Sequence, residues 1–198
     1  MSLLSRRTDC QYHCCILKRV MKRYIHTFDR KLIKKILALP DWVRPTMLFA
    51  TLLGQPPITV GVAGIVIGYG LALDKPHLAI GGVIAAVTFI ISSILKVFLR
   101  RARPENDYVR NMIIQTFSFP SGHAAGSLAS FGMIGLLLAN AWQWNALSIV
   151  ELVAVAVVNI VIGVSRVYLG AHYPSDIIGG WIVGAAGLVA IYVLVLAA

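Results

Sequence analysis

Long apolar runs without a charged residue constrain the fold of this chain more than any other feature. Residues 76–95, 111–150 and 177–198 contain no Asp, Glu, Lys or Arg. The mean hydropathy is +0.79, and a helix of about 20 apolar residues is long enough to cross a bilayer. These runs predict an all-α fold, a multi-pass transmembrane helical bundle.

Polar and turn-forming residues divide the apolar sequence into about five spans. Residues 74–77 and the Trp-containing segment 142–144 are typical of turns at a membrane surface. Pro56 and Pro57 interrupt the first apolar run, so we expect a short half-helix before the first span. The expected spans are residues 58–73, 78–99, 121–140, 146–165 and 177–196.

The basic residues are concentrated before the first span. The formal net charge is +10, and 11 of the 18 Lys and Arg residues precede Thr46. A basic segment beside apolar spans favours contact with anionic lipid and argues against nucleic acid as a partner. We therefore divide the chain into a basic, partly amphipathic N-terminal segment, residues 1–45, and a transmembrane domain, residues 46–198.

Residues 27–39 predict an amphipathic helix within the basic segment. Thr27 is suited to cap its start, and Pro40 is suited to stop it. Its basic side chains lie opposite an apolar face, so we expect it in the membrane interface, with a solvated tail as the alternative. The apolar face comprises Phe28, Leu32, Ile33, Ile36 and Leu37.

The first residues of the chain carry few structural signals. Cys10, Cys14 and Cys15 are odd in number and closely spaced, which argues against a disulfide framework. A metal site with His13 and acylation of a cysteine are alternatives. No compact apolar segment typical of a secretory signal follows the basic start, and Met21 is an alternative start.

Three polar clusters interrupt the apolar sequence, at residues 96–104, 120–123 and 165–176. The first two lie in the connection between the second and third spans. The third lies in the connection between the fourth and fifth. Because consecutive spans alternate in direction, both connections are expected at the same membrane face.

The first two clusters contain groups suited to bind a phosphate. Lys96 and Arg103 are seven residues apart and point the same way if the helix continues that far. Ammonium and guanidinium groups are complementary ligands for phosphoryl oxygens. Ser121 is suited to cap a helix whose free N–H groups favour an anion, and Gly122 allows close approach. Each motif alone is also typical of helix ends at a membrane surface.

The third cluster pairs a histidine with a carboxylate. His172 precedes Asp176 by four residues, and a nucleophilic imidazole needs a partner that fixes its tautomer. His123 in the second cluster is suited to protonate a leaving alkoxide. The other charged residues of these loops are interpreted as lipid-headgroup contacts or solvated charges. They are Arg100, Arg101 and Arg110, and Glu105 and Asp107.

In this order the clusters resemble the signature of the type 2 phosphatidic acid phosphatase family, shared with vanadium-dependent haloperoxidases. The signature is Lys, six residues, Arg-Pro; Pro-Ser-Gly-His; and Ser-Arg, five residues, His, three residues, Asp. Every position is filled, and the resemblance covers residues 78–198. It implies that His172 becomes phosphorylated, that Asp176 orients it and that His123 protonates the leaving group. The phosphate-binding residues that it implies are Lys96, Arg103, Ser121, Gly122 and Arg166.

The resemblance and the spans together predict a membrane-embedded lipid phosphatase. The family needs no metal, and we expect no cofactor. Undecaprenyl pyrophosphate, phosphatidylglycerol phosphate and phosphatidic acid are candidate substrates, and membrane lipids are the expected partners. The alternatives are a lipid phosphotransferase that uses the same phosphohistidine and an inactive membrane scaffold or transporter. The oligomeric state stays open.

The location of the basic residues predicts which membrane face carries the clusters. With five spans, the N-terminus and the clusters share one face, and Lys75 is the only Lys or Arg on the other. The positive-inside rule then favours a cytoplasmic site. Some bacterial family members have an additional span at the front, which we do not find in residues 1–45. An outward site would need residues 46–57 to cross, and these form about 18 Å of helix against a core of about 30 Å.

Overall fold

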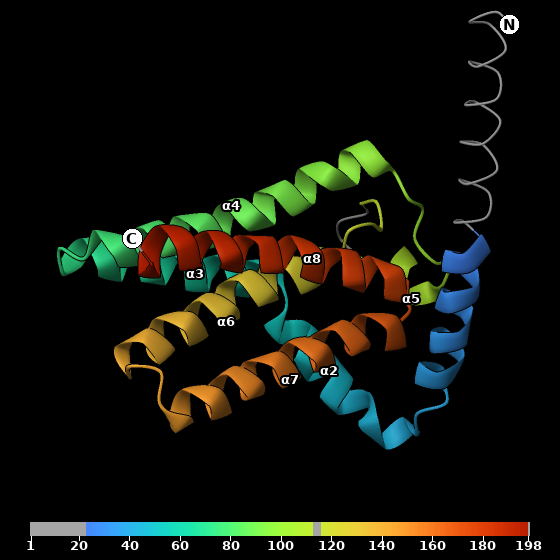
Figure 1. The fold of residues 1–198 in the computed structure, drawn as a ribbon. Helices are drawn as coiled ribbons and strands as arrows, with labels where there is room; N and C mark the ends of the chain where they lie inside the picture. The colour runs from blue at the N-terminus through green and yellow to red at the C-terminus, as the bar shows by residue number, and fades with distance from the viewer. Residues whose placement is uncertain (1–22, 113–115, 198) are drawn as a thin grey trace, which may run out of the picture.

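The computed structural model describes residues 23–112 and 116–197 of the chain (Figure 1). All regular structure within these residues is helical, which confirms the all-α prediction. The cysteine cluster, His13 and the alternative start at Met21 lie outside the described residues.

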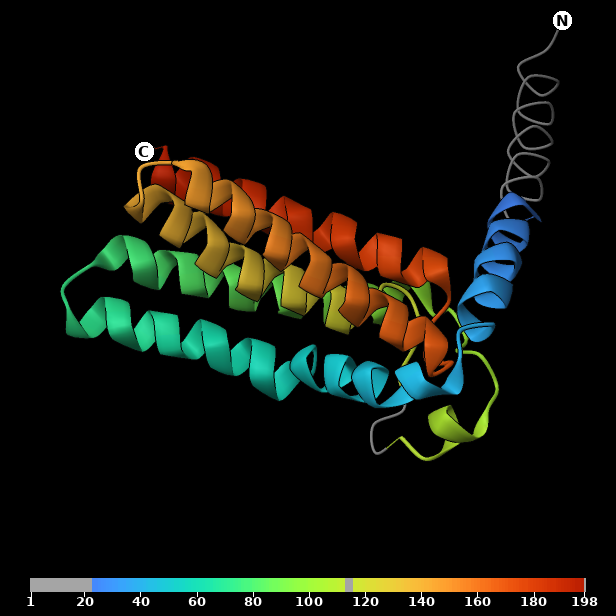
Figure 2. The ribbon, with the colours of Figure 1, turned by 90° about the horizontal axis from the view of Figure 1, so that it is seen from below.

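Long helices run side by side in a bundle (Figures 1 and 2). They are α3 (Pro56–Ala72), α4 (Pro76–Leu99), α6 (Gly122–Ala141), α7 (Ala146–Tyr168) and α8 (Pro174–Ile191), which a π-helical turn extends over Tyr192–Leu196. Among the described residues, α4, α6, α7 and the extended α8 are long and apolar enough to cross a membrane. Helix α3 is apolar but shorter, with 17 residues. These helices correspond to the five predicted spans.

Helix α6 lies at the centre of the bundle and packs against α3, α4, α7 and α8. Small residues allow this close packing. A Cβ atom at Gly180 of α8, for example, would lie 2.5 Å from the backbone oxygen of Ser121. The backbone N–H of Ser121 in turn donates to the oxygen of Asp176 at 2.9 Å. The starts of α6 and α8 are therefore held together.

A helix at residues Arg23–Leu37 crosses the end of the bundle where these two helices start (Figures 1 and 2). Ile33 and Ile36 pack against Val167 and Ile177, so part of the predicted apolar face is covered by the bundle. Phe28 remains exposed. The predicted cap at Thr27 is wrong, because this residue lies inside the helix and its hydroxyl donates to the oxygen of Arg23.

The first apolar run folds as two helices, as the prolines predicted. A short 3₁₀ turn, η1 (Asp41–Val43), leads into α2 (Arg44–Leu53), which packs against α7. The chain then breaks at Gly54 and Gln55, and α3 begins at Pro56. The segment Asp41–Leu53 is bent by 92° from the helix Arg23–Leu37.

Lys96 and Arg103 do not lie on one helix, because α4 ends between them. Its last residue is Leu99, and Arg100 has a left-handed backbone with φ of 46°. Arg103 therefore lies in the following loop, and the seven-residue helical spacing does not set its direction. The loop contains one short helix, α5 (Asp107–Arg110), and passes through a cis peptide bond at Phe119–Pro120 before α6 begins.

Candidate active site

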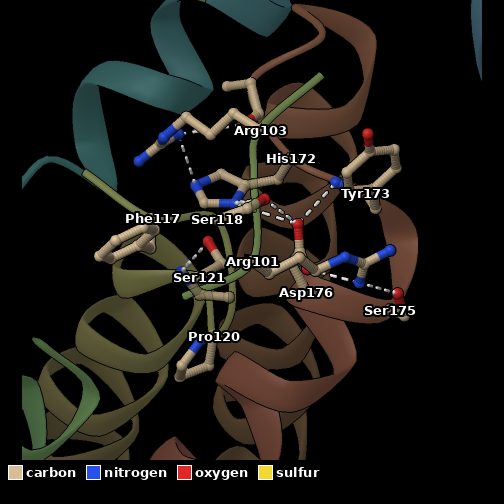
Figure 3. Close-up of polar contacts among 12 residues, drawn as sticks. Arg101, Arg103, Phe117, Ser118, Pro120, Ser121, His172, Tyr173, Ser175 and Asp176 are labelled. Atoms are coloured by element: carbon tan, nitrogen blue, oxygen red, sulfur yellow. Dashed lines mark hydrogen bonds and ion pairs between the residues drawn. The ribbon is translucent and has the colours of Figure 1, made fainter. Parts of the chain in front are cut away.

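The α4–α6 and α7–α8 loops meet at one end of the bundle and bring the three polar clusters together (Figure 3). The α7–α8 turn is tight, since Gly170 has φ of +71°. The backbone oxygen of Arg166 accepts from the N–H groups of Ala171 at 2.9 Å and His172 at 3.3 Å. These bonds fix His172 one turn beyond the end of α7.

Asp176 lies in the first turn of α8, behind the ring of His172. Its Oδ2 atom accepts from the N–H of Tyr173 at 2.8 Å and from the hydroxyl of Ser118. Oδ2 also lies 3.5 Å from Nδ1 of His172. Both His172 and Asp176 are buried, so these contacts are shielded from water.

The contacts of His172 define its protonation state. Nη1 of Arg103 lies 3.2 Å from Nε2 of the ring. A guanidinium can only donate, so Nε2 carries the lone pair and Nδ1 carries the proton, which faces Asp176. Burial lowers the pKa of His172 well below its usual value, and the positive charges of Arg103, Arg166 and Lys96 lower it further. The arrangement gives a neutral imidazole whose Nε2 lone pair accepts from Arg103.

Lys96 and Arg103, two of the three cationic residues predicted to bind phosphate, are bonded to backbone oxygens of the neighbouring loops. Nζ of Lys96 donates to the oxygen of Pro120 at 2.5 Å and approaches that of Phe117 at 3.4 Å. Arg103 donates to the oxygens of Thr116 at 2.7 Å and Ala171 at 2.9 Å. Burial and the charge of Arg166 lower the pKa of Arg103.

Arg166 is 2% exposed and incompletely bonded. Its Nη1 donates to the hydroxyls of Thr51 at 2.5 Å and Tyr108 at 3.2 Å. Its buried Nε–H has no acceptor among the described residues. Buried donors are almost always paired, so this group indicates a place for an acceptor supplied by a ligand. A cluster of cations favours an anion as that ligand.

The start of α6 faces the same region. The hydroxyl of Ser121 accepts from the N–H of Ala124 at 3.4 Å, which confirms it as the helix cap. A Cβ on Gly122 would meet only ordinary contacts, 3.7 Å from Cε of Lys96, so packing alone does not require glycine there. His123 forms no side-chain hydrogen bond within the described part of the chain.

The interpretation of Arg101 as a lipid-headgroup contact is wrong. Its Nη1 donates to Oδ1 of Asp176 at 2.8 Å and to the hydroxyl of Ser175 at 2.7 Å. Its Nη2 donates to Asp29 at 2.8 Å, and its guanidinium lies 4.3 Å from the ring centre of Tyr173. The run of basic residues around Arg101 gave no sign that one of them points inward.

Other contacts of the site had no signal in the sequence. Arg166 bonds to Thr51, which is 115 positions away in the sequence, and to Tyr108, which is 58 positions away. Ser118 lies only three residues before the recognised Ser121, but its role depends on the fold of the loop. Within residues 23–112 and 116–197, no group of three or more His, Cys, Asp or Glu side chains is arranged to hold a metal ion.

Comparison with known sequences gives matches over most of the chain. A family model described as the PAP2 superfamily matches residues 77–198. Undecaprenyl-diphosphatase from Sulfolobus acidocaldarius is 34% identical over 113 residues, which are 52% of this chain and 50% of the relative. Phosphatidylglycerophosphatase B from Bacillus subtilis is 26% identical over 155 residues, 75% of this chain and 73% of the relative. The matched region thus spans about half the length of the first relative and about three quarters of the second.

A solved structure has the same fold. It is the crystal structure of a transmembrane PAP2-type phosphatidylglycerolphosphate phosphatase from Bacillus subtilis, with a TM-score of 0.73 and 22% identity. The match covers 86% of both chains. This similarity confirms the predicted multi-pass transmembrane bundle.

Proposed function

Because this chain belongs to the PAP2 superfamily, among its multi-pass membrane lipid phosphatases, we propose that it hydrolyses a lipid phosphate or pyrophosphate through a phosphohistidine on His172. The family predicted from the three clusters is thereby confirmed. The observation that supports the mechanism best is the environment of His172, with Nε2 facing Arg103 and Nδ1 facing Asp176. A lipid substrate can keep its apolar chain in the bilayer while its headgroup enters the loops.

In the first half of the reaction, the lone pair of Nε2 attacks phosphorus and the bond to the leaving oxygen breaks. His123 gives its proton to that oxygen. Asp176 stabilises the Nδ1–H of the ring as positive charge develops on it. In the second half, water attacks the phosphorus of the phosphohistidine and the bond from phosphorus to Nε2 breaks, which returns its electron pair to Nε2. His123 accepts a proton of that water, and inorganic phosphate leaves.

The phosphoryl oxygens are assigned to the cations and to the start of α6. Lys96, Arg103 and Arg166 supply positive charge, and the unpaired Nε–H of Arg166 supplies a buried donor. The backbone N–H of Gly122 at the start of α6 adds the positive end of a helix. These groups stabilise the charge of the transition state once Arg103 exchanges its bond to Nε2 of His172 for one to a phosphoryl oxygen.

The substrate candidates are those predicted from the sequence together with one suggested by a relative. Undecaprenyl pyrophosphate and phosphatidylglycerol phosphate correspond to the names of the two relatives above, and phosphatidic acid to the name of the resembling family. Lipid A 1-phosphate is added because the lipid A 1-phosphatase of Rhizobium etli is 33% identical over 105 residues, 46% of this chain and 41% of that relative.

The test is phosphate release from each of these four lipids by the purified protein. We expect release from at least one, and rapid quenching with labelled substrate should trap an acid-labile, base-stable phosphoenzyme. His172→Ala should abolish both signals. A label that persists in His172→Ala would contradict the assignment of the nucleophile, and a phosphorylated second lipid would indicate a phosphotransferase.

A further inference from the structure

Asp29 is a buried carboxylate on a helix whose other charged residues are exposed. It is 2% exposed, although it lies in the N-terminal segment among Arg30, Lys31 and Lys34. A charge is buried only at high cost unless it is paired and hydrogen-bonded. The burial of Asp29 is therefore explained by the residues to which it is hydrogen-bonded.

Every contact of Asp29 is to a residue beside the active site. Its Oδ1 accepts from the N–H of Ser175 at 2.8 Å. Its Oδ2 accepts from the hydroxyl of Ser175 and from Nη2 of Arg101, both at 2.8 Å. Both partners adjoin Asp176: Ser175 precedes it in α8, and Arg101 donates to it directly.

Arg101 joins the two carboxylates through one rigid group. Nη2 holds Asp29 and Nη1 holds Oδ1 of Asp176, each at 2.8 Å (Figure 3 shows the Asp176 side). The guanidinium is planar, so fixing one nitrogen restricts the direction of the other. The ring of Tyr173 lies 4.3 Å from the guanidinium carbon and limits its movement further.

The carboxylate of Asp176 is held at both of its oxygens, and Arg101 is one of its supports. Oδ1 is engaged by Arg101, and Oδ2 lies on the Nδ1 side of His172, where it also accepts from the N–H of Tyr173 and the hydroxyl of Ser118. Rotation of the carboxylate would break the Arg101 bond. If Asp29 is removed, Arg101 loses the partner of its second nitrogen, and its support of Oδ1 of Asp176 is weakened while the bonds to Oδ2 remain.

We propose that Asp29 is a positioning residue for the phosphohistidine reaction, acting through Arg101 and Asp176 on His172. The inference rests on the proposed function and extends it to the helix Arg23–Leu37. That helix then contributes to the active site, in addition to any contact with the membrane surface.

The variant Asp29→Asn tests this role, because it keeps the size of the side chain and removes its charge. We expect kcat and the rate of phosphoenzyme formation to fall about 10-fold, as for other residues that orient a functional ligand. KM should change less than about two-fold, since Asp29 does not contact the proposed phosphate-binding cations. Asp29→Glu restores the charge and should recover part of the rate. The matched control is Asp41→Asn, an exposed carboxylate close by in the chain, which should leave both constants unchanged.

A purely structural role would give a different result. In that case Asp29→Asn would lower the amount of phosphoenzyme trapped at saturating substrate, while the rate per competent site stayed at the wild-type value. That outcome would overturn the positioning role. Wild-type protein that forms no phosphoenzyme would instead overturn the proposed function, and the positioning role with it.

A double-mutant cycle identifies the path. If Asp29 acts through Arg101, the double variant Asp29→Asn with Arg101→Gln should lose no more activity than Arg101→Gln alone. Losses that multiply would show that Asp29 acts independently of Arg101, and would overturn the proposed connection to Asp176.

Discussion

At the scale of the residue, the protonation state of His172 depends on the charges around it. An imidazole attacks through the lone pair of its unprotonated nitrogen, here Nε2, and protonation of Nε2 would remove that lone pair. Burial first, and then the cations Arg103, Arg166 and Lys96, lower the pKa of His172. The same cations that are suited to bind a phosphate thus also keep the nucleophile unprotonated.

The pH dependence of phosphoenzyme formation should report this effect. As pH falls through the pKa of His172, the ring gains a proton and the rate falls. We expect this acid limb well below pH 6.5 when a lipid phosphate with a good leaving group is used, because such a substrate depends less on His123.

Arg103→Gln removes one of the positive charges, so the pKa of His172 should rise and the acid limb should move to higher pH. The measurement is the quenched phosphoenzyme rate at substrate concentrations well below KM across a pH series, because this rate reports the free enzyme. An unchanged acid limb in Arg103→Gln would contradict the electrostatic explanation.

At the scale of the element, the break between α2 and α3 places a small residue beside the proposed acid. A Cβ atom added to Gly54 would lie 3.3 Å from Cδ2 of His123 and 2.6 Å from Cγ2 of Ile162. The break between α2 and α3 therefore does more than connect the N-terminal helix to the bundle. It leaves space in which the ring of His123 can take its position.

Gly54→Ala should consequently displace His123 and slow proton transfer to the leaving group. We expect kcat to fall about 10-fold with a poor leaving group and distinctly less with a good one, since misplacing a reacting group by about 1 Å can cost more than this. Gly61→Ala is the matched control, because a Cβ there meets nothing within 4 Å. Equal losses with both kinds of leaving group would argue against an effect on His123.

The spans and the location of the three clusters at one membrane face were predictable from the sequence. The buried residues that contact Asp176 and hold it in place were not. Apolar length and alternating direction are enough to bring Lys96, His123 and His172 to one face. The end of α4 was not predictable, because Arg100 adopts a left-handed backbone conformation there. An arginine in the sequence does not indicate that conformation. Asp29 and Arg101 were missed for a related reason: each lies in a basic segment, and only their contact in space shows that they point inward.

At the scale of the whole molecule, the helix Arg23–Leu37 and the active-site loops lie at the same end of the bundle (Figure 2). Those basic residues before Thr46 that the structure describes therefore lie on the same side of the bundle as the clusters. The positive-inside rule then predicts that this end faces the cytoplasm.

Thiol labelling in intact cells tests this assignment. Single cysteines are introduced at Glu105 and at Pro76, in a background lacking Cys10, Cys14 and Cys15. We expect a membrane-impermeant reagent to label position 76, in the opposite turn, and not position 105. The reverse pattern would place the active site on the outer face, and labelling after permeabilisation serves as the control for reactivity.

The contacts of Asp29 with Ser175 and Arg101 have a consequence for biosynthesis. The helix Arg23–Leu37 leaves the ribosome early, whereas Ser175 and Asp176 lie at the start of the last long helix, α8. The carboxylate pair on Arg101 is therefore completed only once α8 has been made and inserted. A nascent chain that already contains Lys96, Arg103, His123 and Arg166 still lacks the proposed nucleophile His172 and the carboxylate of Asp176, so the proposed hydrolysis cannot begin before α8 has been made.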